Sequence, residues 1–155
     1  MEGVCVLTNT SNKKIKGYIL FNEEKSITKI TINVKGLKKN SKLGFHIHEY
    51  GDLRDGCTSV CQHFNPNNTV HGGKDSKIRH AGDLGNIETN KSGICKCIMY
   101  DKIIKLKGKY NIIGRSVVIH EDEDDLGLGG DQESLITGNS GKRIACGIIG
   151  YSNKC

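Results

Sequence analysis

Several residue types are scarce in this chain of 155 residues. It has no Trp, one Pro and no apolar run of the about 20 residues that a membrane-spanning helix needs, so we expect no membrane partner. No basic segment followed by an apolar stretch opens the chain, so no secretory signal is visible and we expect a cytoplasmic protein. The 20 glycines and one proline make up about 14% of the residues, well below the range of low-complexity chains. The composition therefore predicts an ordinary globular fold.

The net charge of +6 is not organised for binding nucleic acid. Lysines such as Lys13, Lys25 and Lys39 are scattered through turns and strand-like segments. Aromatic residues make up only 5% of the chain and are not interleaved with a basic patch. We expect a solvated surface and no nucleic-acid partner.

Period-2 alternation of apolar and polar residues predicts an all-β fold, most clearly at Ile30–Lys35. The other strand segments are Val4–Leu7, Ile15–Phe21, Lys42–His48, Asp83–Thr89, Ile94–Tyr100, Ser116–His120 and Ile144–Gly150. Turns are expected at 8–12, 22–24, 38–40 and 90–93, and no segment has a convincing helical period. Eight short strands of this kind indicate an antiparallel barrel or sandwich. Since no repeat, linker or composition break interrupts the chain, we expect a single domain over residues 1–155.

Two segments do not fit the strand spacing. Residues 49–82 and 121–142 are long, polar and rich in glycine. Loops of this length are uncommon in compact domains unless they have a function. We expect the functional residues in these two loops and at the strand ends next to them.

Histidines are concentrated beside the first long loop. Five of the six lie between positions 46 and 80, and the sixth, His120, ends a predicted strand. His46 and His48 are two apart on one strand, which places both imidazoles on the same face about 7 Å apart. A single histidine is more often a surface or core residue, but six with a nearby aspartate are typical of metal binding.

The donor set indicates two metal ions. Imidazole suits zinc and copper, and a carboxylate favours zinc. His71, His80 and Asp83 need one more ligand to complete a tetrahedral site. Seven donors fill two four-coordinate sites only if one ligand is shared; otherwise one position stays open. Because an imidazole has two nitrogens, His63, which lies between the two groups, is the natural bridge.

These residues stand in motifs that resemble the copper/zinc superoxide dismutase family, in its intracellular type. The motifs are Gly44–Glu49 with Gly51-Asp52, His63–Pro66, His71–Gly73, His80–Asn86, Gly114-Arg115 leading to His120, and Gly138-Asn139 with Gly141, Arg143 and Ala145–Gly147. The similarity runs from Val4 to Gly150. It implies an eight-stranded antiparallel Greek-key barrel, immunoglobulin-like in its sandwich arrangement, with two long functional loops. It also implies an enzyme that converts two superoxide radicals to O2 and H2O2, cycling copper between Cu(II) and Cu(I).

The resemblance also implies roles for individual residues, with one copper and one zinc per subunit. Copper would be bound by His46, His48, His63 and His120, and zinc by His63, His71, His80 and Asp83, with His63 bridging and carrying a proton. Arg143 would hold the substrate anion by hydrogen bonds, and Thr137 would narrow the channel opposite it. Asp124 would join the outer ring nitrogens of His46 and His71 and hold both sites in register.

The cysteines have several expected roles. The resemblance implies a disulfide between Cys57 and Cys146, closing a loop of about 90 residues that stabilises the fold by roughly 4 to 5 kcal/mol. Cys61, where relatives commonly carry Gly, could compete for Cys146, and our hypothesis is that Cys57 keeps the bond. Cys5 is expected in the core and Cys155 exposed. Cys95 and Cys97 share one strand face, as buried or as oxidation-prone thiols.

The second long loop departs from the family pattern. Relatives often place Lys near the channel mouth, where this chain has Asp122 and Ile136. The global charge of +6 compensates only in part, because salt screens fields beyond about 8 Å. We therefore expect a high rate constant that is less sensitive to salt than in Lys-bearing relatives.

Quaternary state and an alternative function follow from the resemblance alone. A homodimer would use Tyr50-Gly51, Ile113-Gly114 and Gly150-Tyr151, and the resemblance leaves a copper chaperone open as a second partner. The alternative function is a copper carrier on the same fold without dismutase activity. All seven ligand positions and Arg143 are retained, which favours the enzyme.

Overall fold

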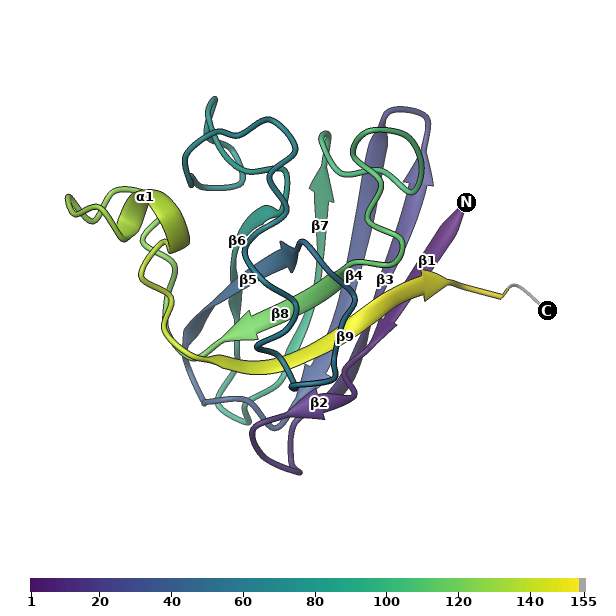
Figure 1. Ribbon diagram of the computed structural model, residues 1–155. Coiled ribbons are helices and arrows are strands. Elements are labelled where there is room, and N and C mark those ends of the chain that lie inside the picture. Colours follow the sequence, from purple (N-terminus) through teal and green to yellow (C-terminus); the bar gives the residue numbers. More distant parts are fainter. Residues whose placement is uncertain (154–155) are drawn as a thin grey trace.

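The computed structural model describes residues 1–153; the expectation for Cys155 lies outside the described residues. Within that range there are nine strands and one short helix (Figure 1). They are β1 (Glu2–Val6), β2 (Asn9–Thr10), β3 (Lys16–Glu24), β4 (Ile27–Lys35), β5 (Lys42–His48), β6 (Asp83–Glu88), β7 (Cys95–Asp101), β8 (Ser116–His120), α1 (Ser134–Thr137) and β9 (Arg143–Tyr151). All eight predicted strands are present, and the all-β prediction is confirmed.

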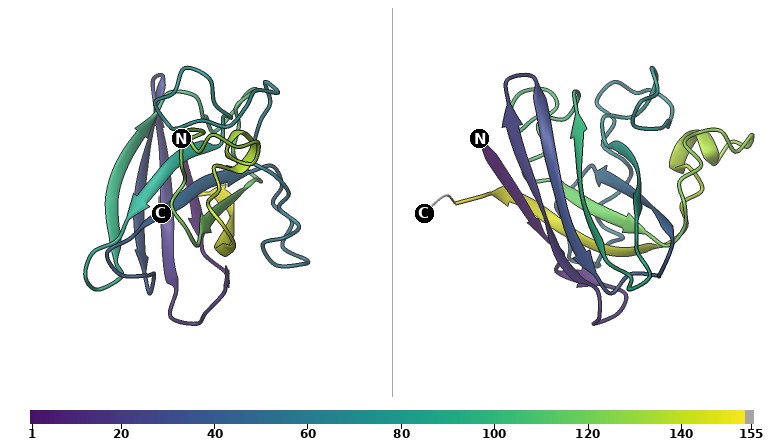
Figure 2. Two further views of the ribbon diagram at one scale, coloured as in Figure 1. Left: turned by 90° about the vertical axis from the view of Figure 1, so that its left-hand side faces the viewer. Right: turned by 180° about the vertical axis from the view of Figure 1, so that it is seen from behind.

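The strands form a nearly closed antiparallel barrel. Their order is β6-β5-β8-β9-β1-β3-β4-β7, and β6 approaches β7 without a ladder of hydrogen bonds. β9 joins the two halves, because its first part pairs with β8 and its last part with β1. The chain crosses between the halves after β4, β6 and β7, which gives the expected Greek-key connectivity (Figures 1 and 2).

Two local expectations were wrong. Residues 22–24 continue β3, because Glu24 pairs with Ile27 across a tighter turn in which Lys25 has φ +56°. The expected turn at 8–12 contains β2, where Asn9 pairs with Cys146 of β9. The second long loop contains α1, which at four residues is too short to show a helical period.

Alternation along the strands fills the interior with apolar side chains. On β4 the buried residues are Thr28, Ile30, Ile32 and Val34, and their neighbours are half-exposed or exposed. Phe45 and Ile47 of β5 point into the same interior cluster. His46 and His48, which alternate with them, therefore lie on the outer face of the barrel.

The two long loops cover this outer face, which explains why nearly all of β5 and the whole of β8 are buried. Backbone hydrogen bonds fix the first loop on β5: Ile47 N–H donates to Gly82, and Phe64 N–H donates to Ile47. Figures 1 and 2 place α1 of the second loop on the side away from the two termini. Among residues 1–153 no helix has the length and apolar character needed to span a membrane.

Candidate metal centre

The strands and loops bring all six histidines together. His46 and His48 extend from β5, His120 ends β8, and His63 meets His48 through an isolated β-bridge. The rings of His46 and His48 are 6.4 Å apart, close to the spacing expected from the strand. Register shifts occur beside two of these residues, between Gly44 and His46 and between Ile119 and His120. Such bulges redirect side chains next to functional sites.

His46, His48, His63 and His120 form a first cluster, in which the potential ligand atoms all lie within 4.8 Å of one another. His48 Nδ1–H donates to the Cys61 carbonyl at 2.8 Å, and His120 Nδ1–H donates to the Gly141 carbonyl at 3.2 Å. These bonds leave the two Nε2 atoms, 3.4 Å apart, facing each other with their lone pairs available.

Asp83 is the centre of a second cluster with His63, His71 and His80. One carboxylate oxygen, Oδ1, lies 2.8, 3.0 and 3.1 Å from the Nδ1 atoms of the three histidines. The other oxygen accepts backbone N–H groups of Gly72 at 3.1 Å and His80 at 2.8 Å. The carboxylate is thus held in place with one oxygen aimed at three imidazoles.

Asp124 connects the clusters. Its two oxygens lie 2.6 Å from His46 Nε2 and 2.8 Å from His71 Nε2, and its side chain is fully buried. Asn86 holds the Asp124 backbone on both sides, accepting its N–H at 2.8 Å and donating to its carbonyl at 2.9 Å. Because one rigid carboxylate orients both rings, the remaining nitrogens of His46 and His71 point into different clusters.

The chemistry of these residues fits metal ions. Within the described residues, the only buried side-chain N or O atoms without a hydrogen bond of good geometry are Nδ1 of His46 and Nδ1 of His71, although the His71 atom lies 3.0 Å from Asp83 Oδ1. A tetrahedral ion with bonds of about 2.0–2.1 Å would separate its ligands by about 3.3 Å. The second cluster is close to that size, with His80 and His63 Nδ1 atoms 3.4 Å apart. Two ions would satisfy both atoms.

Electrostatics keeps the donors of the first cluster and Asp83 in their ligating forms, whereas His71 must lose a proton to bind a metal ion. Although burial opposes the shift, the carboxylates of Asp124 and Asp83 raise the pKa of His71 to about 9. Burial lowers the pKa of His46 and His48 well below the usual value, and lowers that of His120 to about 4. Although burial opposes it, the hydrogen bonds from the histidines hold the pKa of Asp83 far below its usual range. Metal ligands must be neutral imidazoles and ionised carboxylates, so the first cluster and Asp83 are already in that state at neutral pH.

A pocket opens from the first cluster to the surface. His48, His63 and His120 form its floor, and Thr137 and Arg143 belong to its wall. Arg143 is half-buried, and its guanidinium donates to the carbonyls of Cys57 at 2.7 Å and Thr58 at 3.2 Å. The structure therefore brings every predicted site residue to one centre.

The predicted disulfide is present. Cys57 is bonded to Cys146 with Cα atoms 5.8 Å apart, while Cys61 is free and exposed. The bond ties the first loop to β9, the strand that begins with Arg143. The disulfide thus fixes the carbonyls that anchor the guanidinium.

Comparison with known proteins decides the family. The family model for copper/zinc superoxide dismutase matches residues 15–149. The chain belongs to the copper/zinc superoxide dismutase family. It is accordingly an oxidoreductase that dismutes superoxide, with copper and zinc as its cofactors.

Individual relatives agree with this assignment. A superoxide dismutase [Cu-Zn] from Paramecium bursaria Chlorella virus 1 is 61% identical over 140 residues, covering 90% of this chain and 75% of the relative. One from Neurospora crassa is 48% identical over 154 residues, covering 98% of this chain and 99% of the relative. The crystal structure of the clock protein EA4 superimposes with a TM-score of 0.92 at 39% identity, covering 97% of this chain and 94% of that one.

Sequence reasoning missed several residues of the centre. The carbonyls of Cys61 and Gly141 orient two histidines, but main-chain atoms leave no mark on residue type. Glu133 lines the pocket without a predicted role; Ile136 lines it as expected, while Asp122 is not among its lining residues. Asn86 stands at the end of the His80–Asn86 motif, where its residue type alone indicates no role, although its amide is matched to the backbone of Asp124.

Proposed function

We propose that the first cluster is the copper site, the second is the zinc site, and His63 bridges them. The observation that carries this assignment is the composition of the clusters. The first has imidazoles only and opens to the pocket, whereas the second is closed and contains a carboxylate, which favours zinc. His63 belongs to both, with Nδ1 in the second cluster and Nε2 left for the first.

Each residue has a defined part in the reaction. When bound, copper supplies the one-electron chemistry that converts two superoxide radicals and two protons to O2 and H2O2. Arg143 donates hydrogen bonds from the pocket wall to the anion and orients it. Thr137 narrows the pocket beside it. His63 takes up a proton at the ring nitrogen that faces the first cluster and releases it to the reduced product.

Selective loss of each metal tests the assignment. His120→Asn is expected to lose copper and keep zinc, and His80→Asn to lose zinc and keep copper, as measured by mass spectrometry of metal content. His63→Ala should weaken the binding of both metals. Loss of zinc from the His120 variant with copper retained would reverse the assignment. Activity is measured as superoxide consumption before and after reconstitution with metal, and it is expected to rise and fall with the copper content. Zinc binding with no activity after copper loading would favour the copper-carrier alternative.

We further propose a homodimer. Tyr50 and Tyr151 are 55% and 63% exposed, and Ile148 beside them is 43% exposed. The segments that carry them are joined, because Gly114 N–H donates to the Ile149 carbonyl and Gly51 packs against the Gly114 carbonyl. Exposed aromatic side chains on one face fit a second copy of this chain. Sedimentation equilibrium should show a dimer for the natural chain and a monomer for Tyr151→Lys; a monomeric natural chain would refute the proposal.

We propose that the protein works in the cytoplasm as a single folding domain. Four cysteines within residues 1–153 are free, which suits a reducing compartment better than an oxidising one. Fractionation of producing cells should place the protein with cytosolic markers. One cooperative calorimetric transition for the metal-loaded protein would support a single domain, whereas two separated transitions would contradict it.

A further inference from the structure

Two thiols form a close pair outside both metal clusters. Cys95 and Cys97 both point inward from β7, and their sulfur atoms are 3.6 Å apart. Cys95 is fully buried and Cys97 is half-buried. The dismutase reaction proposed above uses neither residue.

The pair lies beside the one seam of the barrel that lacks a strand ladder. β7 is hydrogen-bonded to β4 along its whole length, but on its other side it meets β6 without pairing. A groove along that seam is lined by Asn86 and Glu88 of β6 and by Met99 of β7. Cys97 is not among the residues that line this groove, but it is half-buried rather than enclosed, so a small solute can reach its thiol.

The two thiols differ in reactivity. The hydrogen bond from Cys95 lowers the pKa of Cys97 to about 7, although burial and the Glu88 carboxylate oppose the shift. The same bond, together with burial, raises the pKa of Cys95. Since the thiolate is the nucleophile, Cys97 is the thiol that reacts first, and Cys95 is positioned to react with the product.

We propose that Cys95 and Cys97 are a peroxide-reactive dithiol that converts reversibly to a Cys95–Cys97 disulfide. The Cys97 thiolate attacks one oxygen of H2O2, the O–O bond breaks, and the departing hydroxide takes a proton to leave as water. Cys95 then loses its proton and attacks the sulfur of the Cys97 sulfenic acid, so that the S–S bond forms, the S–O bond breaks and a second water leaves. Two thiols are oxidised and one peroxide is reduced.

Strand geometry makes such a disulfide easy to reduce. Residues two apart on a strand have their Cα and Cβ atoms each about 6.6 Å apart, whereas a disulfide holds its Cβ atoms about 3.5 to 4.5 Å apart, so β7 must bend locally for this bond to form. A bond formed there is strained, and strained disulfides are the labile ones. The Cys57–Cys146 bond has its Cα atoms 5.8 Å apart, a usual spacing for a disulfide. Residues 1–153 therefore contain one structural disulfide and one pair of cysteines suited to reversible oxidation.

The source of peroxide rests on the proposed function, since H2O2 is the product of dismutation. The thiol chemistry itself does not depend on it. Adding H2O2 directly to the metal-loaded protein tests the pair whether or not the protein dismutes superoxide, so the two proposals fail separately.

Peptide mapping gives a direct readout. Trypsin cleavage after Lys96 separates the cysteines into peptides 92–96 and 97–102, which only a disulfide can hold together. After a pulse of H2O2 and alkylation of free thiols, the linked peptides should appear, and dithiothreitol should remove them. Cys5 is the internal control, because its burial raises the pKa to about 12 and it should stay reduced. Exposed Cys61 reports general thiol oxidation.

Single-cysteine variants and the pH dependence of alkylation distinguish the role of Cys97 from that of Cys95. Cys95→Ala should leave Cys97 as a sulfenic acid trapped by dimedone, and Cys97→Ala should slow oxidation of Cys95 at least tenfold. Alkylation of Cys97 by iodoacetamide should rise with pH about a midpoint near 7, and Cys95→Ala should move that midpoint upward. The proposal is overturned if the natural protein shows no linked peptides when Cys61 is oxidised, if Cys97 passes to sulfinic acid with Cys95 still free, or if oxidation requires bound copper.

Discussion

At the scale of single residues, Asp124 contacts a histidine of each metal cluster with one side chain. One carboxylate orients His46 toward the first cluster and His71 toward the second. Burial makes the pair of contacts rigid, and no other described side chain touches the outer nitrogen of both rings. A change here should alter metal binding without altering any ligand.

Asp124→Asn should weaken zinc binding about 10- to 100-fold, because the amide replaces one of the two acceptors with a donor. Competition with a chelator, followed by metal analysis, measures the change. Glu121→Gln is the matched control, since this residue lies in the same loop with an exposed side chain. Unchanged zinc affinity in the Asp124 variant would show that the ligands orient themselves.

Arg143 is predicted to act on the substrate and not on the metals. Arg143→Gln should lower the rate constant for superoxide about tenfold or more, which corresponds to about 1.4 kcal/mol or more, in the range of a hydrogen bond to a charged group. Pulse radiolysis provides the rate and mass spectrometry the metal content. Arg54→Gln removes an equal charge from an exposed position and should change little. Equal losses in both variants would assign Arg143 to general charge alone.

At the scale of elements, the Cys57–Cys146 disulfide joins the first long loop to β9 across a separation of 89 residues. Replacing both cysteines with Ala should destabilise the protein by about 4 to 5 kcal/mol in the chain-entropy model, as measured by urea unfolding. Cys61→Ser should change the free energy of unfolding by less than about 0.5 kcal/mol, since the residue is exposed and unbonded. A small effect of the double variant would mean that the hydrogen bonds alone hold the loop.

Strands were predictable from the sequence, and short or backbone-determined features were not. Alternation identified β4 because over Ile30–Lys35 each inward position is apolar and each outward position polar. β2 and α1 are too short to carry a period, and the end of β3 is set by its register with β4 and not by its polar residues.

The candidate site likewise contains some residues that the sequence predicts and others that it does not. The ligands and Asp124 follow from residue types in recognisable motifs. The carbonyls of Cys61 and Gly141 have no counterpart in residue type, because any amino acid offers the same atom. The lining of the pocket by Glu133 depends on how the second loop folds over β8, which the sequence pattern does not specify.

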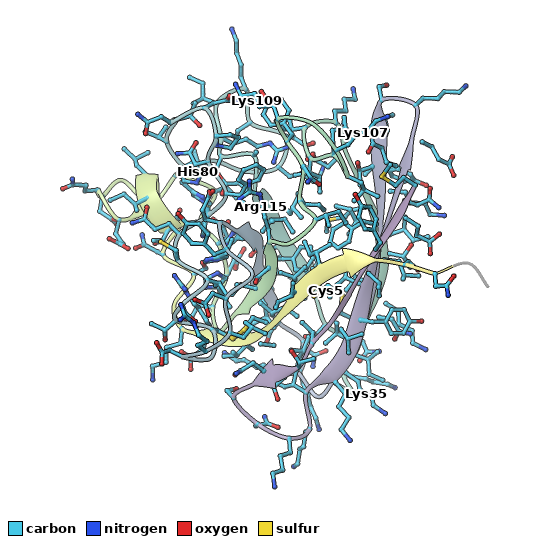
Figure 3. The ribbon with its side chains drawn as sticks, turned by 45° about the vertical axis from the view of Figure 1, so that its right-hand side comes forward. Cys5, Lys35, His80, Lys107, Lys109 and Arg115 are labelled. Carbon is cyan, nitrogen blue, oxygen red and sulfur yellow. A yellow bond between two sulfur atoms is a disulfide. The ribbon has the colours of Figure 1, made fainter. Side chains whose placement is uncertain are left out.

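At the scale of the whole molecule, the positive charge is dispersed. Lys35 lies at one end of the barrel and Lys107 and Lys109 at the other (Figure 3). The described pocket has Arg143 as its one cation beside Glu133 and the apolar Ile136. Electrostatic attraction of superoxide to the pocket therefore relies on the electric field of the whole protein, which salt screens over about 8 Å.

Ile136→Lys should raise the rate constant about twofold at low ionic strength and make it fall more steeply with added salt. One charge about 10 Å from an anion is worth about 0.4 kcal/mol in water. Leu128→Lys is the control, because it adds the same charge to the same loop at a position that is 82% exposed and not among the pocket residues. A steep salt dependence in the natural chain would contradict the prediction.

The placement of His46 and His48 on the outward side of β5 has a consequence for redesign. Phe45 and Ile47 alternate with them and fill the barrel, so the side chains that stabilise the fold and those that receive metal occupy opposite faces of one strand. Substitutions on the outward face leave the interior packing intact. The barrel is thus a scaffold on which ligand sets of other composition can be installed by changing alternate residues and the two loops above them.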